Sequence, residues 1–328
     1  MPSDNTCWVV SDGRAGNERQ ALALAHGLGF DTRVMRMKLR EPWQGLAPRL
    51  TLGVRHAIVA EGGVRFEPPW PEVAIGAGRR AALVTRMLRR WSKGGAYTIQ
   101  ILDPRIDPRE FDIVVAPLHD NLAGANVVQT IGALNPVDAD WLADGRRRFA
   151  ALAALPEPRT TVLIGASNRA QRLDEPYFDS LVERLHRRHA SDGGSFLVSA
   201  SRRTPANVVA RLRDAFRVLP GVFHAPGDTG ENPYPGLLGW AQRFVVTPDS
   251  VNMISECCAT ERPVYTFAPR PIGGKLASFH ARLRASGALR DLDDPRPAPP
   301  RSPLAETSAV AEIVRERWAA ERRHPVDS

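Results

Sequence analysis

The sequence has 328 residues, 43% of them hydrophobic and 24% charged, and this balance is typical of soluble globular proteins and excludes fibrous and disordered chains. The net charge is +8, but only three residues are lysines and the arginines are scattered, so we expect no nucleic-acid partner. No apolar run approaches the roughly 20 residues that span a bilayer, and the first residues do not resemble a signal peptide, so we expect a cytoplasmic protein.

Short apolar segments alternate with helix-length amphipathic segments along the whole chain, which predicts parallel sheets built from βαβ units. In the first half, strands are predicted at 7–10, 32–37, 73–75, 97–102, 111–116 and 126–130. Helices are predicted at 18–27, 79–91 and 138–155. The last of these meets Pro156-Glu157-Pro158, and proline interrupts a helix, so we predict a first domain over residues 1–155.

The second half begins with a continuous apolar strand at 160–164. Further strands are predicted at 195–199, 221–224, 244–247 and 263–267, with helices at 175–190, 205–216, 234–241 and 251–259. A proline-rich linker at 294–303 precedes a helix at 305–323 that has apolar positions at helical spacing. We therefore predict a second domain over 156–303, followed by a helix and tail over 304–328, and interpret both domains as Rossmann-like and doubly wound.

Two charged segments have more than one interpretation. Residues 86–93 hold three arginines and a lysine and predict one face of a helix, which either meets solvent or rests on an anionic membrane surface. Asp138-Ala139-Asp140 matches a pattern that holds a metal in other nucleotide-sugar enzymes, but no predicted strand precedes it, so we interpret it as a helix cap. The three cysteines lack the spacing of a zinc site, and we predict neither a metal nor a cofactor.

Loops that follow strands are the first candidate sites, because ligands of open α/β sheets bind beyond the carboxyl ends of the strands. The first such loop covers residues 11–17, where glycines let the backbone approach a ligand and amides at a helix start attract an anion. A similar loop at 76–80 could orient an acceptor or a phosphate. An ordinary turn is the alternative for both loops. Their acceptor-side candidates are Gly13, Gly16, Asn17, Gly78 and Arg79.

The first half also offers candidates for a general base. His119 and Asp120 follow the predicted strand at 111–116. Imidazole titrates near neutral pH and a carboxylate beside it could orient the ring, which suits a group that removes a proton from an acceptor. Asp12 is the third catalytic candidate. Loop polarity without catalysis is the alternative for the His119 and Asp120 pair.

The second half contains the segments that best suit a phosphate. Small residues at 165–168 and two arginines in the segment 201–205 follow neighbouring predicted strands, and a guanidinium binds phosphate oxygens in pairs. Asp249 or Ser250 is predicted to cap the next helix, in which a buried Glu256 would need a partner such as a ribose diol. Simple capped helix starts are the alternative. The nucleotide-binding candidates are Gly165, Ser167, Asn168, Ser201, Arg202, Arg203, Asp249, Ser250, Asn252 and Glu256.

Several segments together resemble the mitochondrial-fission "elongated mitochondria" family, which contains plant proteins and uncharacterised bacterial ones. The resemblance covers nearly the whole chain. It rests on Ser11-Asp12-Gly13, Pro117-Leu118-His119-Asp120, Ser201-Arg202-Arg203-Thr204-Pro205, Glu231-Asn232-Pro233-Tyr234, Val245-Val246-Thr247-Pro248-Asp249-Ser250, Met253-Ile254-Ser255-Glu256 and Pro263-Val264-Tyr265.

The resemblance implies a GT-B-like fold, in which two Rossmann-like domains face a cleft, similar to the transferases of peptidoglycan and lipid A synthesis. In those enzymes a helix start holds the donor nucleotide and a glutamate binds the ribose. This implies nucleotide binding by Ser250 and Glu256 here, with Gly165, Ser167 and Arg202 near the diphosphate. The segment 257–262 lacks the small-residue and glycine ending that is usual before Pro263, so the exit of this helix is expected to differ.

We therefore predict a metal-independent glycosyltransferase that uses a nucleotide-sugar donor in cell-envelope glycoconjugate synthesis, with an unidentified acceptor bound by the N-terminal domain. Two alternatives stay open. One is a GT-B-shaped scaffold that binds partner proteins or the inner membrane surface. The other is a nucleotide-sugar epimerase or hydrolase on the same fold.

Overall fold

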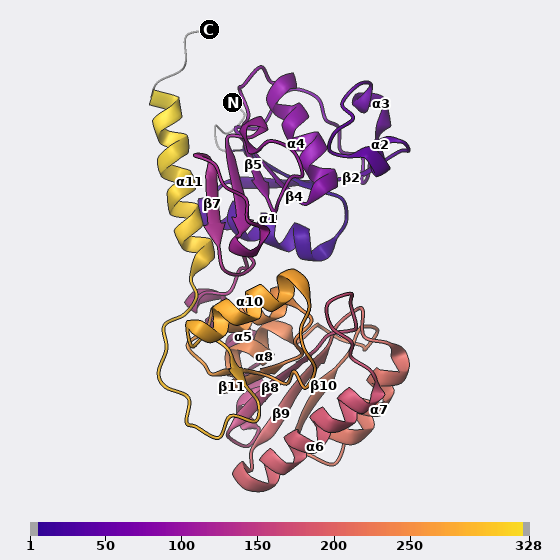
Figure 1. The fold of residues 1–328 in the computed structure, drawn as a ribbon, viewed down its shortest axis with the longest axis vertical. Helices are drawn as coiled ribbons and strands as arrows, with labels where there is room; N and C mark the ends of the chain where they lie inside the picture. The colour runs from indigo at the N-terminus through magenta and orange to yellow at the C-terminus, as the bar shows by residue number, and fades with distance from the viewer. Residues whose placement is uncertain (1–5, 324–328) are drawn as a thin grey trace. The chain divides into compact units, whose positions relative to one another are not determined.

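The computed structural model describes residues 6–323 and divides into two compact units (Figure 1). Of the described residues, 6–136 and 305–323 form the N-terminal domain, and 137–304 form the C-terminal domain. The chain therefore passes from one domain to the other twice. The predicted tail beyond residue 323 lies outside the described residues, as do residues 1–5.

The N-terminal domain contains one seven-stranded sheet. Its strands are β1 (Thr6–Ser11), β2 (Asp31–Leu39), β3 (Ile58–Ala60), β4 (Val73–Ala77), β5 (Tyr97–Ile101), β6 (Ile113–Pro117) and β7 (Val127–Thr130). Their order is β3-β2-β1-β4-β5-β6-β7, and every neighbouring pair is parallel except β2 and β3. Strands β4, β5 and β6 are buried along their whole length, as the inner strands of a parallel sheet with helices on both faces should be.

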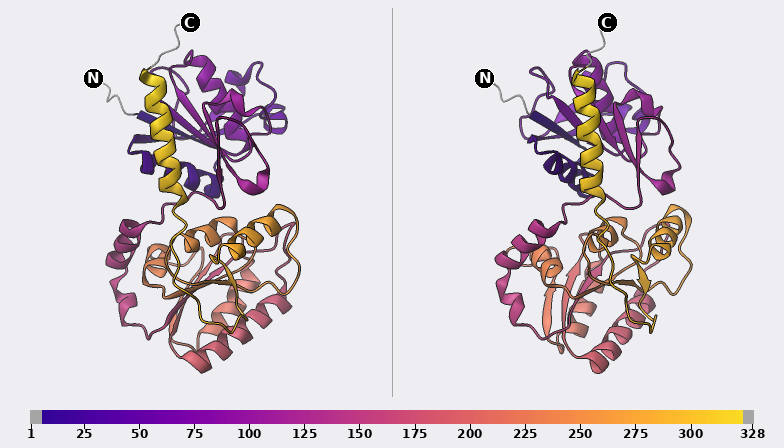
Figure 2. Two further views of the ribbon diagram at one scale, coloured as in Figure 1. Left: turned by 60° about the vertical axis from the view of Figure 1, so that its left-hand side comes forward. Right: turned by 90° about the vertical axis from the view of Figure 1, so that its left-hand side faces the viewer.

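Helices cover both faces of this sheet. Apolar side chains of α1 (Ala15–Leu28) and α11 (Glu306–Arg323) pack on one face, and those of α4 (Arg79–Trp91) pack on the other. In α4 the buried side chains Ala81, Val84 and Leu88 recur at helical spacing, so one stripe of the helix faces the sheet. Figure 2 shows α11, in yellow, running along the N-terminal domain.

The segment between β2 and β4 departs from a plain βαβ crossover. It contains two short helices, α2 (Trp43–Leu46) and α3 (Val54–Ala57), and the edge strand β3. Strand β3 runs antiparallel to β2, with Val59 opposite Lys38. These elements are not predicted from the sequence, because each is too short to show a clear periodicity.

The C-terminal domain contains one six-stranded sheet that is parallel throughout. Its strands are β8 (Arg159–Ile164), β9 (Ser195–Ala200), β10 (Gly221–His224), β11 (Arg243–Val246), β12 (Val264–Thr266) and β13 (Arg290–Asp291), in the order β10-β9-β8-β11-β12-β13. Because Ile164 aligns with Ala200, and Leu163 with Val246, the loops after β8, β9 and β11 begin at nearly the same level of the sheet.

The helices of this domain form a layer on each side of the sheet. Helices α6 (Glu175–Asp192) and α7 (Ala206–Phe216) pack on one face. On the other, α8 (Tyr234–Trp240) and a 3-10 helix at Ala150–Ala154 pack against Leu197. The remaining helices are α5 (Ala139–Arg148), α9 (Val251–Cys258) and α10 (Gly274–Ala285). No helix in the described part of the chain is long and apolar enough to cross a membrane.

The structure differs from the predicted domain organisation. The compact units divide at residues 136 and 137, and the predicted boundary is 155 and 156. The helix predicted over 138–155 ends at Arg148, and its residues pack with α8 in the C-terminal domain. The terminal helix belongs to the N-terminal domain, where Val310, Ala311 and Val314 are buried. Helix α10 and strand β13 were not anticipated.

Candidate functional site

Three neighbouring loops meet at the carboxyl edge of the sheet in the C-terminal domain. They follow β8, β9 and β11, and β8 lies between the other two strands. The order of the strands reverses between β8 and β11, which makes this the topological switch point where ligands bind in open α/β sheets. The structure therefore brings the nucleotide-binding candidates of three separate segments to one edge.

Asp249 joins these loops through a fully buried carboxylate. It accepts hydrogen bonds from Thr247 Oγ1 at 2.7 Å, Ala166 N at 3.1 Å and Arg203 Nη2 at 3.0 Å. Burial raises the pKa of Asp249, while these partners act to lower it. A Cβ on Gly165 would lie only 2.1 Å from Asp249 Oδ1, so this position requires glycine. Gly165, Arg203 and Asp249 are thus brought together to build the loops.

The side chains of two further candidates form hydrogen bonds that shape the loop after β8. Ser167 Oγ donates to Leu173 O at 2.9 Å and accepts from Leu173 N at 2.8 Å. Asn168 donates to the Asp249 carbonyl at 3.0 Å, and its Oδ1 accepts the amides of Ala170 and Gln171. These side chains hold the loop in shape, and the amide of Asn168 also donates within the loop, to Gln171 O at 2.9 Å.

The loop after β9 is fixed at its ends and exposes an arginine. Ser201 N donates to Ile164 O at 2.8 Å, and Thr204 Oγ1 donates to Gly165 O at 2.9 Å, which ties this loop to the start of the β8 loop. Arg202 is exposed and has no hydrogen-bond or ion-pair partner among the residues that the structure describes. Arg169 in the β8 loop, which was not among the predicted site residues, is also exposed and also lacks a partner among the described residues.

Helix α9 begins as predicted, with Ser250 as its N-cap. Ser250 Oγ accepts from Met253 N at 3.4 Å, and Asn252 is half-buried in the first turn. Glu256 is only 1% exposed, and Tyr234 of α8 donates its hydroxyl to Glu256 Oε2. We expected a ligand ribose to satisfy this carboxylate, and the structure supplies a protein hydroxyl instead. Tyr234 stands in a segment that carried the family resemblance, but its contact with Glu256 was not anticipated.

His280 of α10 forms a hydrogen bond with the loop that follows β11. Its Nε2 donates to Pro248 O at 2.8 Å, and the side chain is buried. Burial lowers the pKa of His280 to about 4. The ring is therefore neutral near pH 7, as a donor to a carbonyl in an apolar setting should be.

The N-terminal domain has its own switch point, between β1 and β4. Asn17 donates to Ala77 O at 3.3 Å, and Gly78 has a φ of +83° that favours glycine. The Asp12 side chain is almost buried, with Arg80 Nη1 4.0 Å from its Oδ2. The loops with Gly13, Gly16, Asn17 and Gly78 do meet, but Arg79 differs from expectation. It donates to the carbonyls of Gln44 and Gly45 and so holds α2 in place. Arg80, and not Arg79, lies beside Asp12.

His119 and Asp120 lie in a 3-10 helix (Leu118–Asp120) directly after β6, with β5 between this strand and β4. Both side chains are largely buried. His119 Nε2 and Asp120 Oδ1 are 3.9 Å apart, which is an ion-pair separation and too long for a hydrogen bond. The pair stays a predicted base at the same edge of the sheet as Asp12.

The other charged segments take structural roles. Asp138 caps α5 by accepting from Trp141 N at 2.8 Å, which confirms the interpretation of this segment as a cap. On α4, Arg86 and Arg90 pair with Glu110, and Arg89 pairs with Asp112. Carboxylates therefore neutralise much of the basic stretch at 86–93.

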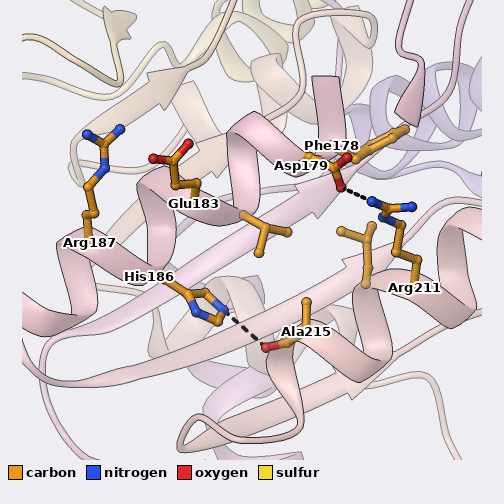
Figure 3. A pocket seen from close by; sticks show the side chains of 9 residues that line it. Phe178, Asp179, Glu183, His186, Arg187, Arg211 and Ala215 are labelled. Carbon is orange, nitrogen blue, oxygen red and sulfur yellow. Dashed lines mark hydrogen bonds and ion pairs between the residues drawn. The ribbon is translucent and has the colours of Figure 1, made fainter. Parts of the chain in front are cut away.

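A hollow of about 340 Å³ lies between α6 and α7 (Figure 3). Its floor is apolar, Asp179 pairs with Arg211 across it, and His186 Nε2 is 3.1 Å from Ala215 O. These contacts join the two helices of one layer. The hollow contains none of the predicted site residues, and we interpret it as a gap between packed helices.

Solved structures share the arrangement of two doubly wound domains. The UDP-GlcNAc 2-epimerase from Neisseria meningitidis, in a structure bound to UDP-GlcNAc, matches with a TM-score of 0.55 at 11% identity, over 96% of this chain and 99% of that one. The glycotransferase of kitacinnamycin matches with a TM-score of 0.51 at 14% identity, over 97% and 94%. The protein therefore has a GT-B-like fold, the fold of a class that contains glycosyltransferases and nucleotide-sugar epimerases.

The family within this class follows from the sequence. The family model described as mitochondrial fission ELM1 matches residues 15–318. The mitochondrial fission protein ELM1 of Arabidopsis thaliana is 30% identical over 310 residues, which cover 84% of this chain and 70% of the plant protein. The chain belongs to the mitochondrial fission ELM1 family, as its segments predicted.

Proposed function

We propose that this protein binds a nucleotide sugar at the carboxyl edge of the sheet in its C-terminal domain and transfers the sugar to an acceptor without a metal ion. The observation that carries the proposal is the exposed guanidinium of Arg202, which has no partner among the described residues. It lies in a loop that Thr204 ties to the β8 loop, at the switch point of the sheet. An unpaired cation at this place suits the diphosphate of a sugar donor.

The neighbouring groups divide the remaining roles. The amides that open α9 lie at the same edge and favour an anion, and Arg169 adds a second unpaired cation. Asp249 and Arg203 hold the loops and are not expected to contact the donor directly. In the N-terminal domain, Asp12, His119 or Asp120 would accept the proton of the acceptor hydroxyl.

The proposal rests on recognition of the diphosphate and not of the ribose. Glu256 is buried and bonded to Tyr234, so this carboxylate has a structural partner whether or not it also meets a ribose. The Neisseria epimerase of similar fold is described as bound to UDP-GlcNAc, which makes UDP-GlcNAc the first ligand to test.

Ligand binding is measured by thermal shift with UDP, ADP, CMP and GDP sugars, followed by calorimetry with the best ligand, in the presence of a chelator. We expect Arg202→Gln to weaken binding roughly ten- to hundredfold, because a hydrogen bond to a charged group contributes about 1.5–3 kcal/mol. Arg217→Gln, an exposed arginine just beyond the other end of α7, is the matched control and should bind like the parent protein.

The outcomes separate this proposal from its alternatives. A protein that no sugar nucleotide stabilises would contradict it and favour the scaffold. Equal loss of affinity in both arginine variants would show that general charge, and not a site at Arg202, holds the ligand. Release or epimerisation of the sugar without any acceptor would favour a hydrolase or epimerase over a transferase.

A further inference from the structure

The segment 40–59 of the N-terminal domain exposes large apolar side chains. Leu52 is 84% exposed, Leu46 is 54% exposed and Val59 is 39% exposed. Among the described residues, the other large apolar side chain of this kind is Val218, beyond the end of α7 in the other domain. Scattered single exposures are ordinary, but three of the four fall within 14 residues of this one segment.

Hydrogen bonds to the backbone hold the segment 40–59 in place. The two leucines are therefore exposed by an ordered segment and not by a loose loop. Arg79 of α4 donates to the carbonyls of Gln44 and Gly45, which belong to the two peptide bonds before Leu46. Arg86 donates to Pro48 O at 3.1 Å. Trp43 Nε1 donates to the carbonyl of Leu52 itself at 2.8 Å. Two arginines of α4 and one indole therefore fix the backbone that presents the two leucines.

Cations accompany the apolar side chains. Arg40 and Arg49 are exposed, and the described residues offer neither side chain a hydrogen bond or ion pair. The one acidic residue of the segment, Glu41, is bonded to Gln44 and to the amide of Gly45. The basic stretch of α4 is different, because Glu110 and Asp112 pair with its arginines.

We propose that the segment 40–59 docks the protein on an anionic phospholipid bilayer. Leu46 and Leu52 enter the interface of the bilayer, and Arg40 and Arg49 contact lipid phosphates. A rigid apolar tip flanked by unpaired arginines matches a surface that is negatively charged outside and apolar beneath. The proposal does not depend on nucleotide-sugar binding, which is assigned to the C-terminal domain.

The test is co-sedimentation of the full chain with vesicles of phosphatidylcholine alone and of phosphatidylcholine mixed with phosphatidylglycerol. We expect binding to the mixed vesicles that falls as salt is added. Leu52→Ser and Leu46→Ser should each weaken it about tenfold, and Arg49→Gln about fivefold. Val218→Ser, which removes a side chain of similar exposure elsewhere, is the matched control and should bind like the parent.

Thermal unfolding of each variant checks that the fold is intact. Substitutions at exposed positions should leave it unchanged. Unchanged vesicle binding in the two leucine variants would overturn the proposal. So would equal binding to neutral and anionic vesicles. If the parent protein instead ignores vesicles and forms dimers in ultracentrifugation that Leu52→Ser dissociates, the patch is a self-association surface and the proposal is wrong.

Discussion

The buried carboxylate of Asp249 gives two other predicted site residues, Gly165 and Arg203, a structural role. Its partners Ala166 and Arg203 are distant along the chain and meet it only because β9, β8 and β11 are neighbours in the sheet. The sequence identifies Asp249 and Arg203 as polar residues near strand ends, but the pairing follows from the order of the strands. Arg203 is used by this pairing, and Arg202, which precedes it, has no partner among the described residues.

His280 makes the stability of the C-terminal domain depend on pH. Burial lowers its pKa to about 4 in the folded protein, and an unfolded histidine titrates near pH 6.5. The unfolded chain therefore binds the proton first, so folding free energy is lost as the pH falls from about 6.5 to 4, by about 3 kcal/mol in total. Above pH 6.5 this contribution does not change.

Urea unfolding of the parent and of His280→Gln between pH 7.5 and 4 measures this effect. Carboxylates titrate alike in both proteins, so the difference between the two curves isolates the histidine. We expect a shallower loss of stability in the variant. Parallel curves over this range would show that His280 does not carry the dependence.

At the scale of elements, helix α9 is held at its two ends by residues from different segments of the C-terminal domain. Ser250 caps its start, and Arg301 of the proline-rich segment 294–303 closes its end. The Arg301 guanidinium donates to Cys258 O at 2.9 Å, Arg262 O at 3.0 Å and Cys257 O at 3.1 Å. Carbonyls at the end of a helix lack partners within it, so this arginine satisfies them.

We expect Arg301→Met to lower the free energy of unfolding by about 2 kcal/mol, because half-buried carbonyls lose charged donors. Chemical denaturation measures the loss. Arg296→Met is the matched control from the same segment, since the Arg296 side chain is 81% exposed and its bonds within the described part of the chain go to Asp294 alone. A similar loss in the two variants would mean that the arginines act through general charge and not through the end of α9.

The periodicity of the sequence predicted most long elements, and the structure confirms them. Strand β9, for example, lies at Ser195–Ala200 where a strand was expected at 195–199. The elements that were not predicted have local features that explain why. Helix α10 follows Gly273 and has arginines and small residues that hide its apolar stripe, and β13 has only two residues. The roles of the site candidates stay predictions, and contacts such as Tyr234 with Glu256 could not be derived from spacing because they join different helices.

At the scale of the whole molecule, the chain returns to its first domain through α11. Glu306 accepts the amides of Ile131 and Gly132, and Thr307 exchanges hydrogen bonds with the backbone of Asn135. Hydrogen bonds therefore join the two chain segments that connect the domains, at the points where each belongs to the N-terminal domain. The sequence predicted the helix from its apolar spacing, but not the domain to which it belongs, because its partner α1 lies near the start of the chain.

This return makes the stability of the N-terminal domain depend on the last helix of the chain. Val314 is 1% exposed in the core that α11 shares with α1, so Val314→Asp would bury a charge without a partner and cost about 3 kcal/mol or more. Because α11 belongs to the N-terminal domain, calorimetry should show one unfolding transition shifted to lower temperature and a second one, from residues 137–304, unchanged. Glu316→Gln, on the exposed side of the same helix, should shift neither transition. If Val314→Asp lowered both transitions equally, α11 would have to stabilise the two domains as one cooperative unit.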